Sequence, residues 1–257
     1  MDGSHKPNTP HNKAHPAPGA VTGTPSGIVV LDKPSGMSSM RGVAIVRRKA
    51  GLKAGHAGTL DPLATGVLVV AIGPATKSLD RFMKTDKRYH TVVDLSGFTV
   101  TDDREGELEV VDTLNPPTRS KIEDLLAKRF TGRFMQKPPN FSARKIDGQR
   151  AYKLARKGGQ PKLEPREVMV HQIDVLSYEW PNVELDIRCE KGFYVRSLAR
   201  ELGEALETGG HCASIRRTAV GPFTLDDAID PDDLPDPVPA ELVMPLAEAL
   251  ERLDRTG

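Results

Sequence analysis

A single acidic residue stands in a loop that is otherwise built of small and constrained residues. The segment spans residues 55–66, reads GHAGTLDPLATG and contains Asp61 as its only carboxylate. Its three glycines allow sharp turns and the close approach of another backbone, and Pro62 keeps Asp61 in an extended conformation. The pattern predicts a tightly shaped loop that presents one carboxylate for chemistry. The alternative is that Asp61 only starts a turn, as aspartate before proline commonly does.

The second concentration of reactive side chains is basic and lies in the segment 133–166. This segment holds ten lysine and arginine residues against two acidic residues, while residues 225–237 hold six aspartates and no basic residue. Three aromatic residues, Phe134, Phe141 and Tyr152, interleave with the basic ones. Such a pattern predicts a surface that binds a polyanion. A solvated basic face is the alternative interpretation.

The composition excludes several classes of protein. The chain has 257 residues, a formal net charge of +1, 38% hydrophobic residues and 28% charged residues, which suits a soluble globular protein with a proper core. No apolar run reaches the roughly 20 residues that span a bilayer, and the N-terminus lacks the apolar segment of a signal peptide. Cys189 and Cys212 are too few for a disulfide framework or a cysteine-rich metal site. We therefore expect a cytoplasmic protein that contacts no membrane and holds no metal.

The order of structural elements is predicted from periodicity. Residues 1–26 are rich in proline, glycine, threonine and asparagine, which predicts a disordered tail. Apolar patterns predict strands within 27–36, 67–73, 88–97, 168–179, 183–190 and 219–225. Helical patterns cover 38–51, 76–87, 120–130, 194–206 and 239–253, with Ser120 and Glu123 as a capping box. Because strands and helices mix without a strict βαβ alternation, we expect an α+β fold around one mixed sheet.

Four segments of the chain carry a resemblance to a known family. They read LDKPSGMSS at 31–39, GHAGTLDPLATGVL at 55–68, KRYHTVV at 87–93 and CEKGFYVRSLARELG at 189–203. In this order they closely resemble the TruB family of tRNA pseudouridine synthases, and residues 138–158 and 214–223 extend the resemblance. It implies a mostly antiparallel, pseudouridine-synthase-like sheet flanked by helices, forming a catalytic domain over 27–225. It also implies an inserted RNA-clamping arm at about 131–166, and leaves 226–257 as a short helical extension without a full additional RNA-binding domain.

The resemblance also implies a reaction, the isomerisation of uridine to pseudouridine in the T-loop of tRNA. The bond from C1′ to N1 of the target uridine is broken, and a bond from C1′ to C5 is made. Substrate and product contain the same atoms, so the reaction needs no cofactor and no metal. In this family the aspartate at the position of Asp61 is the catalytic carboxylate. It can attack C1′ to form a glycosyl ester, or assist elimination toward a glycal, and the sequence leaves both routes open.

Further site residues follow from the same resemblance, and each has a structural alternative. Arg196 would keep the carboxylate ionised and aimed, unless it is an exposed arginine at a helix start. Tyr89 would stack on the uracil and take part in proton transfer, unless it is a core aromatic residue of a strand. The expected substrate and RNA contacts are Tyr194, His56, Lys33, Ile215, Arg144, Lys145 and Arg150. For Lys33, an ordinary surface lysine is a nearly equal alternative.

One departure from the family pattern and two rival functions bear on this interpretation. Many relatives have threonine where this chain has Ala57, but no assigned catalytic role depends on that hydroxyl. One rival function is a non-catalytic tRNA-binding or tRNA-folding protein on the same fold. The other is a guide-RNA-directed pseudouridine synthase subunit, which generally carries a further C-terminal RNA-binding domain. We expect instead a monomer that acts on the T-arm of tRNA without an obligatory protein partner or guide RNA.

Overall fold

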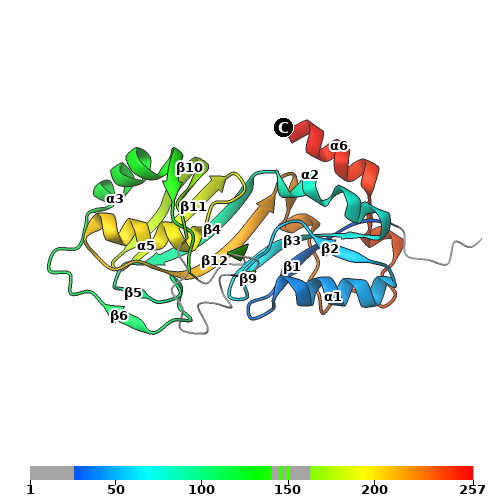
Figure 1. Ribbon diagram of the computed structural model, residues 1–257, viewed down its shortest axis with the longest axis horizontal. Coiled ribbons are helices and arrows are strands. Elements are labelled where there is room, and N and C mark those ends of the chain that lie inside the picture. Colours follow the sequence, from blue (N-terminus) through cyan, green and yellow to red (C-terminus); the bar gives the residue numbers. More distant parts are fainter. Residues whose placement is uncertain (1–25, 141–144, 147–148, 151–162, 257) are drawn as a thin grey trace, which may run out of the picture.

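The architecture is a long mixed sheet with helices on both sides (Figure 1). The computed structural model describes residues 26–140, 145–146, 149–150 and 163–256. Within these residues one ten-stranded sheet has the order β14-β1-β3-β12-β4-β11-β10-β7, and β2 and β13 pair with β3 and β12. Every pair in it is antiparallel except β12 with β3. The predicted α+β class with one mixed, mostly antiparallel sheet is confirmed.

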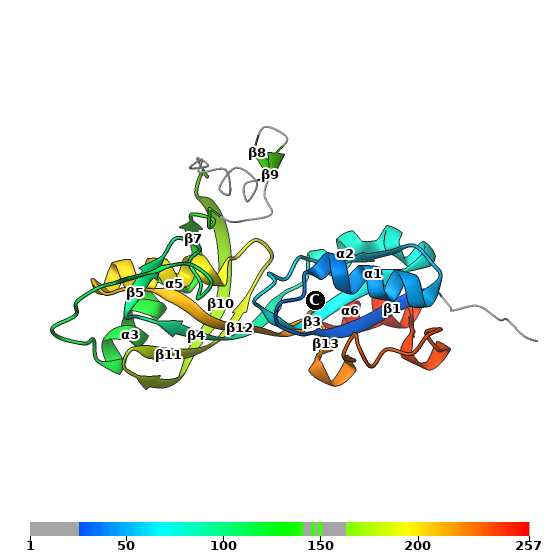
Figure 2. The same cartoon turned by 90° about the horizontal axis from the view of Figure 1, so that it is seen from below.

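The strands of this sheet come from segments along the whole length of the described chain. They are β1 (Gly27–Lys33), β2 (Ala54–His56), β3 (Thr65–Ile72), β4 (Lys87–Asp94), β7 (Gly132–Gln136), β10 (Arg166–Glu179), β11 (Asn182–Cys189), β12 (His211–Val220), β13 (Phe223–Thr224) and β14 (Met244–Pro245). Two small hairpins lie apart from the sheet, and they are formed by β5 (Gly97–Thr99) with β6 (Leu108–Val110) and by β8 (Lys145–Ile146) with β9 (Gln149–Arg150). Figure 2 shows β8 and β9 standing well away from the body.

The helices cover the sheet differently in its two halves. They are α1 (Ser39–Ala50), α2 (Leu79–Met83), α3 (Arg119–Leu125), α5 (Val195–Leu206) and α6 (Leu246–Thr256), with a 3-10 turn at Gly73–Ser78 and a π turn at Leu126–Phe130. In the half built on β1 and β3, α1 packs on one face, while α2 and α6 pack on the other. In the half built on β4, β11 and β10, α3 and α5 share one core. The strand β12 joins the two halves (Figure 1).

The first helix begins and ends where its sequence predicts. The hydroxyl of Ser38 accepts a hydrogen bond from the backbone N–H of Arg41, and Gly51 closes the helix at a φ of 65°. The capping box predicted for α3 is wrong. Thr118 caps that helix by accepting from the N–H of Lys121, and Glu123 instead forms an ion pair with Arg119.

Other boundaries also differ from the prediction. The strand predicted at 219–225 is the end of β12, which begins at His211, followed by the two-residue strand β13 that pairs back onto it. The helix predicted at 76–87 is a 3-10 turn followed by the five residues of α2. The last predicted helix, 239–253, is divided by β14, which pairs with β1 at the edge of the sheet. At β13 and β14 tertiary pairing decided the boundary, because β13 pairs with β12 and β14 pairs with β1.

The described residues cover only part of the predicted domain division. Residues 1–25 of the predicted tail and most of the predicted arm after residue 140 lie outside the described residues. The predicted extension at 226–257 adds β14 to the sheet, and Ala249 and Leu253 of α6 to the core. The boundaries between these parts therefore stay a prediction.

Candidate active site

The loop that carries Asp61 is fixed by side chains that hydrogen-bond its backbone. The buried ammonium of Lys33 donates to the carbonyls of Pro34, Met37 and Pro62 at 2.9, 2.7 and 3.2 Å. The hydroxyl of Ser39 bonds both the carbonyl and the N–H of Leu60 at 2.8 Å. Both residues next to Asp61 in sequence are thus held, and the carboxylate is presented by a loop with little freedom.

The carboxylate of Asp61 meets the guanidinium of Arg196, with 2.9 Å between Oδ2 and Nη2. The side chain of Arg196 is 5% exposed, so its interpretation as an exposed arginine is wrong. Its other nitrogen, Nη1, lies 3.2 Å from Oδ2 of Asp103 and donates to the carbonyl of Thr101 at 2.9 Å. Burial alone would lower the pKa of Arg196, but Asp61 and Asp103 raise it above its ordinary value. The guanidinium therefore stays charged and holds Asp61 in place.

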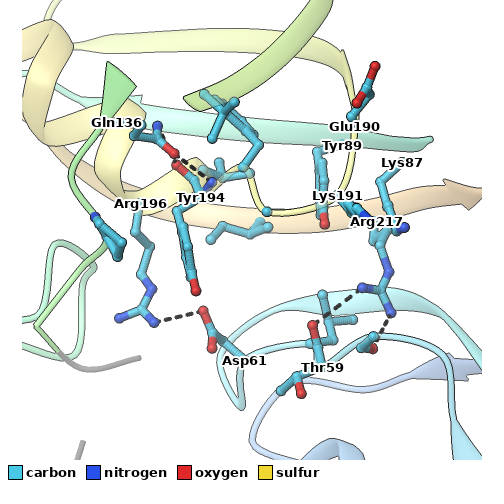
Figure 3. Close-up of a pocket in the computed structure, with 18 of the residues that line it drawn as sticks. Thr59, Asp61, Lys87, Tyr89, Gln136, Glu190, Lys191, Tyr194, Arg196 and Arg217 are labelled. Carbon is cyan, nitrogen blue, oxygen red and sulfur yellow. Dashed lines mark hydrogen bonds and ion pairs between the residues drawn. The ribbon is translucent and has the colours of Figure 1, made fainter. Parts of the chain in front are cut away.

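Two tyrosines line the same cavity as this ion pair. The backbone of Tyr194 is held by the buried Gln136, which accepts from its N–H at 2.8 Å and donates to its carbonyl at 3.1 Å. Burial and then the charge of Asp61 raise the pKa of Tyr194, and its ring points toward Asp61 (Figure 3). Tyr89 projects from β4, and burial raises its pKa as well. Both phenols are therefore neutral donors at physiological pH.

These groups line one cavity of about 640 Å³ between the two halves of the sheet (Figure 3). Its walls include Asp61, Tyr89, Tyr194, Arg196 and Ile215. The structure therefore brings together five of the residues predicted from sequence. A cavity of this size and polarity accepts a small polar ligand, such as a nucleoside, that stacks on an aromatic ring.

The remaining predicted residues are placed differently. Lys33 is fully buried beneath the loop, so its interpretation as a surface lysine is wrong, and its contacts are with loop carbonyls. His56 lies at the end of β2 and is absent from the cavity wall, and burial lowers its pKa. Lys145 and Arg150 lie in β8 and β9. Arg144 lies outside the described residues.

Gln136, Asp103 and Arg217 are among the site residues that were not predicted. Gln136 and Asp103 act through the backbone of Tyr194 and through Arg196, and no short-range pattern marks them. Arg217 lines the cavity and is 1% exposed. A signal for Arg217 was present, because it falls two residues after the buried Ile215 on an otherwise apolar strand face.

Histidine, cysteine and acidic side chains also lie elsewhere in the described part of the chain. No group of three or more histidine, cysteine, aspartate or glutamate side chains there could hold a metal ion. No described helix is long and apolar enough to cross a membrane. Cys189 and Cys212 are both buried and unpaired with one another, and burial raises the pKa of each thiol to about 12. The cavity brings the carboxylate, the guanidinium and the phenols together.

Comparisons with known proteins show the family to which the chain belongs. Residues 45–195 match the model of the TruB family pseudouridylate synthase N-terminal domain. Residues 196–251 match the model of the tRNA pseudouridylate synthase B C-terminal domain. The chain therefore belongs to the TruB family of pseudouridylate synthases, and it is an isomerase that makes pseudouridine.

Individual relatives support the same assignment. The chain is 47% identical over 232 residues to tRNA pseudouridine synthase B of Corynebacterium efficiens, covering 88% of this chain and 77% of that protein. It is 44% identical over 238 residues to the protein of the same name from Thermobifida fusca, covering 87% and 78%. Among solved structures, a chain of a Cbf5-Nop10-Gar1 complex matches with a TM-score of 0.68 and 30% identity. That match covers 88% of this chain and 62% of the solved one.

Proposed function

We propose that this enzyme converts uridine to pseudouridine in the T-loop of tRNA, with Asp61 as the catalytic carboxylate. The observation that carries the proposal is the Asp61–Arg196 ion pair at 2.9 Å in the wall of a nucleoside-sized cavity. Relatives that are 44–50% identical bear the name tRNA pseudouridine synthase B, which supports tRNA as the substrate class.

The residues divide the chemistry between them. Asp61 faces C1′ of the flipped nucleotide, where positive charge develops when the bond to N1 breaks. Arg196 keeps this carboxylate charged and aimed. Tyr89 provides the aromatic face on which the freed uracil stacks while it turns to present C5. When C5 bonds to C1′, the proton on C5 leaves and N1 takes up a proton, so the reaction needs no external reactant.

The wider site would hold the RNA. The basic segment that contains Arg144, Lys145 and Arg150 binds phosphates of the T-arm, and His56 supports the loop from which the base has left. Lys33 acts on the RNA only indirectly, because it is buried under the Asp61 loop. Ile215 and Tyr194 line the base pocket.

The proposal also covers the compartment, the oligomeric state and the partners of the enzyme. We expect a cytoplasmic monomer that needs no cofactor, guide RNA or partner protein. One solved relative of this chain occurs in a Cbf5-Nop10-Gar1 complex. The experiment must therefore distinguish activity of the protein alone from activity that depends on partners.

The test is tritium release from tRNA that carries tritium at C5 of uridine. Purified protein alone should release tritium from unmodified tRNA, and from a tRNA in which only the T-loop position is labelled. Binding without release would support the non-catalytic alternative. Release only after guide RNA and partner proteins are added would support the guide-directed alternative.

A further inference from the structure

Arg217 is a buried cation that forms no ion pair with any carboxylate of the described residues. It is one of the largest fully buried side chains. Its guanidinium donates to the carbonyls of Val67, Thr59 and Gly58, at 2.8, 3.4 and 3.3 Å. Within the described residues no acidic side chain forms an ion pair with it, whereas Arg196 in the same cavity has two. An uncompensated buried charge is costly, so its position calls for a function.

Further basic side chains lie at the same end of the cavity. Lys87 and Lys191 line the wall beside Arg217, with Glu190 as the acidic residue among them (Figure 3). Burial, followed by the charge of Arg217, lowers the pKa of Lys87 to about 8. The cavity thus has two poles, with the carboxylate of Asp61 at one and the guanidinium of Arg217 at the other.

This polarity matches the charges that the reaction separates. When the C1′–N1 bond breaks, its electron pair stays on N1, so the sugar becomes positive and the uracil negative. The negative charge spreads from N1 to the exocyclic oxygens of the ring. It disappears when C5 attacks C1′ and N1 is later protonated. This separation occurs on both the ester route and the glycal route.

We propose that Arg217 and Lys191 form an anion subsite opposite Asp61, which binds the uracil anion released when the C1′–N1 bond breaks. The proposal rests on the proposed function, because it assigns a role within that reaction. The loop carbonyls that Arg217 bonds keep its guanidinium in a fixed position, and a preorganised cation stabilises developing charge without reorganisation.

The test varies the stability of the anion. Single-turnover rates are measured on T-arm RNA that carries either uridine or 5-fluorouridine at the target position. Loss of the starting nucleoside is followed by chromatography after nuclease digestion. The fluorine withdraws electrons and stabilises the detached base by itself. Arg217→Gln should therefore slow the uridine substrate about 100-fold and the fluorouridine substrate much less.

Matched variants separate this role from a structural one. Arg216→Gln alters the neighbouring residue, which lies 2.7 Å from Asp32 and is absent from the cavity wall, and it should leave both rates unchanged. Lys191→Gln alters an exposed residue that folding tolerates, and it should show the same selective loss in smaller measure. The Lys191→Gln variant therefore tests the proposal even if Arg217→Gln fails to fold.

The outcomes are distinct. An equal loss on both substrates would show that Arg217 only holds the loop, and would overturn the proposal. Weaker RNA binding with an unchanged rate at saturating RNA would mean that the subsite binds a phosphate, which also overturns it. If the unaltered protein reacts with neither substrate, it is the proposed function that fails.

Discussion

Replacing Asp61 by asparagine should abolish catalysis while leaving the fold almost unchanged. Asparagine keeps the size of the side chain but cannot carry the negative charge that faces C1′. The stability cost is small, because the side chain of Asp61 is 36% exposed and Arg196 retains Asp103 as a buried partner. A partly exposed ion pair contributes at most about 1 kcal/mol. For a chain of this length that lowers the melting temperature by about 2–4 °C.

Asp103→Asn is the matched comparison. The side chain of Asp103 is 3% exposed, and it also accepts hydrogen bonds from Thr101 and from the N–H of Glu105. Removing one partner of a buried pair costs about 3 kcal/mol or more, which lowers the melting temperature by about 10 °C. The asparagine variant at position 61 should therefore be the more stable of the two.

The assay is a single-turnover tritium release on saturating tRNA, run beside thermal unfolding and a binding titration. Asp61→Asn should bind tRNA as tightly as the unaltered protein, since affinity rests on many phosphate contacts. Its rate should fall far more than tenfold. If it kept more than about a tenth of the rate, a barrier change under roughly 1.4 kcal/mol, Asp61 would be a turn-forming residue rather than the catalytic carboxylate.

Three further predictions concern the surroundings of the site. Neutralising Arg144, Lys145 and Arg150 together should weaken tRNA binding and reduce its salt dependence, with a smaller effect on the rate at saturating RNA; an unchanged salt slope would show that these residues form a solvated face. Burial lowers the pKa of Lys33 from 10.5 to about 8, so between these values the unfolded chain binds a proton that the folded chain lacks. The free energy of unfolding should therefore rise with pH over that window, and it should rise less in Lys33→Met. The free energies are measured by urea denaturation at pH 8 and 10, and an equal rise in the two proteins would contradict this. Activity should survive exhaustive chelation, and inactivation reversed by one divalent ion, at levels too low to refold tRNA, would refute that expectation.

Sequence patterns predicted the parts of the fold that local chemistry determines. The helix α1 could be placed because Ser38 and Gly51 terminate it by hydrogen bonding and by backbone conformation. The buried strand β3 could be placed because its apolar run is continuous. The strand β12 was largely missed, since it interrupts its apolar residues with Ser214, Arg216 and Arg217. Pairing with strands on both sides compensates for that pattern.

The site residues also fall into those that the sequence predicted and those that only the folded chain shows. Family resemblance supplied Asp61, Arg196 and Tyr89, and the structure gathers all three around one cavity. The residues that support them were not predicted, because they belong to segments that are distant along the chain. Asp103 lies 93 residues from Arg196 along the chain, and Gln136 lies 58 residues from Tyr194. Only the folded chain shows that these pairs meet.

The parallel pairing of β12 with β3 has a consequence for how the enzyme becomes active. Arg216 and Arg217 pair with Thr65 and Gly66, about 150 residues earlier in the chain. Closing so long a loop is slow, because its entropy is lost before the contacts form. Lys33 and Ser39 hold part of the Asp61 loop, but the hydrogen bonds from Arg217 to the carbonyls of Gly58 and Thr59 require this long-range pairing. Recovery of activity during refolding should therefore lag behind recovery of helical signal, which makes catalysis itself a reporter of the last long-range step in folding.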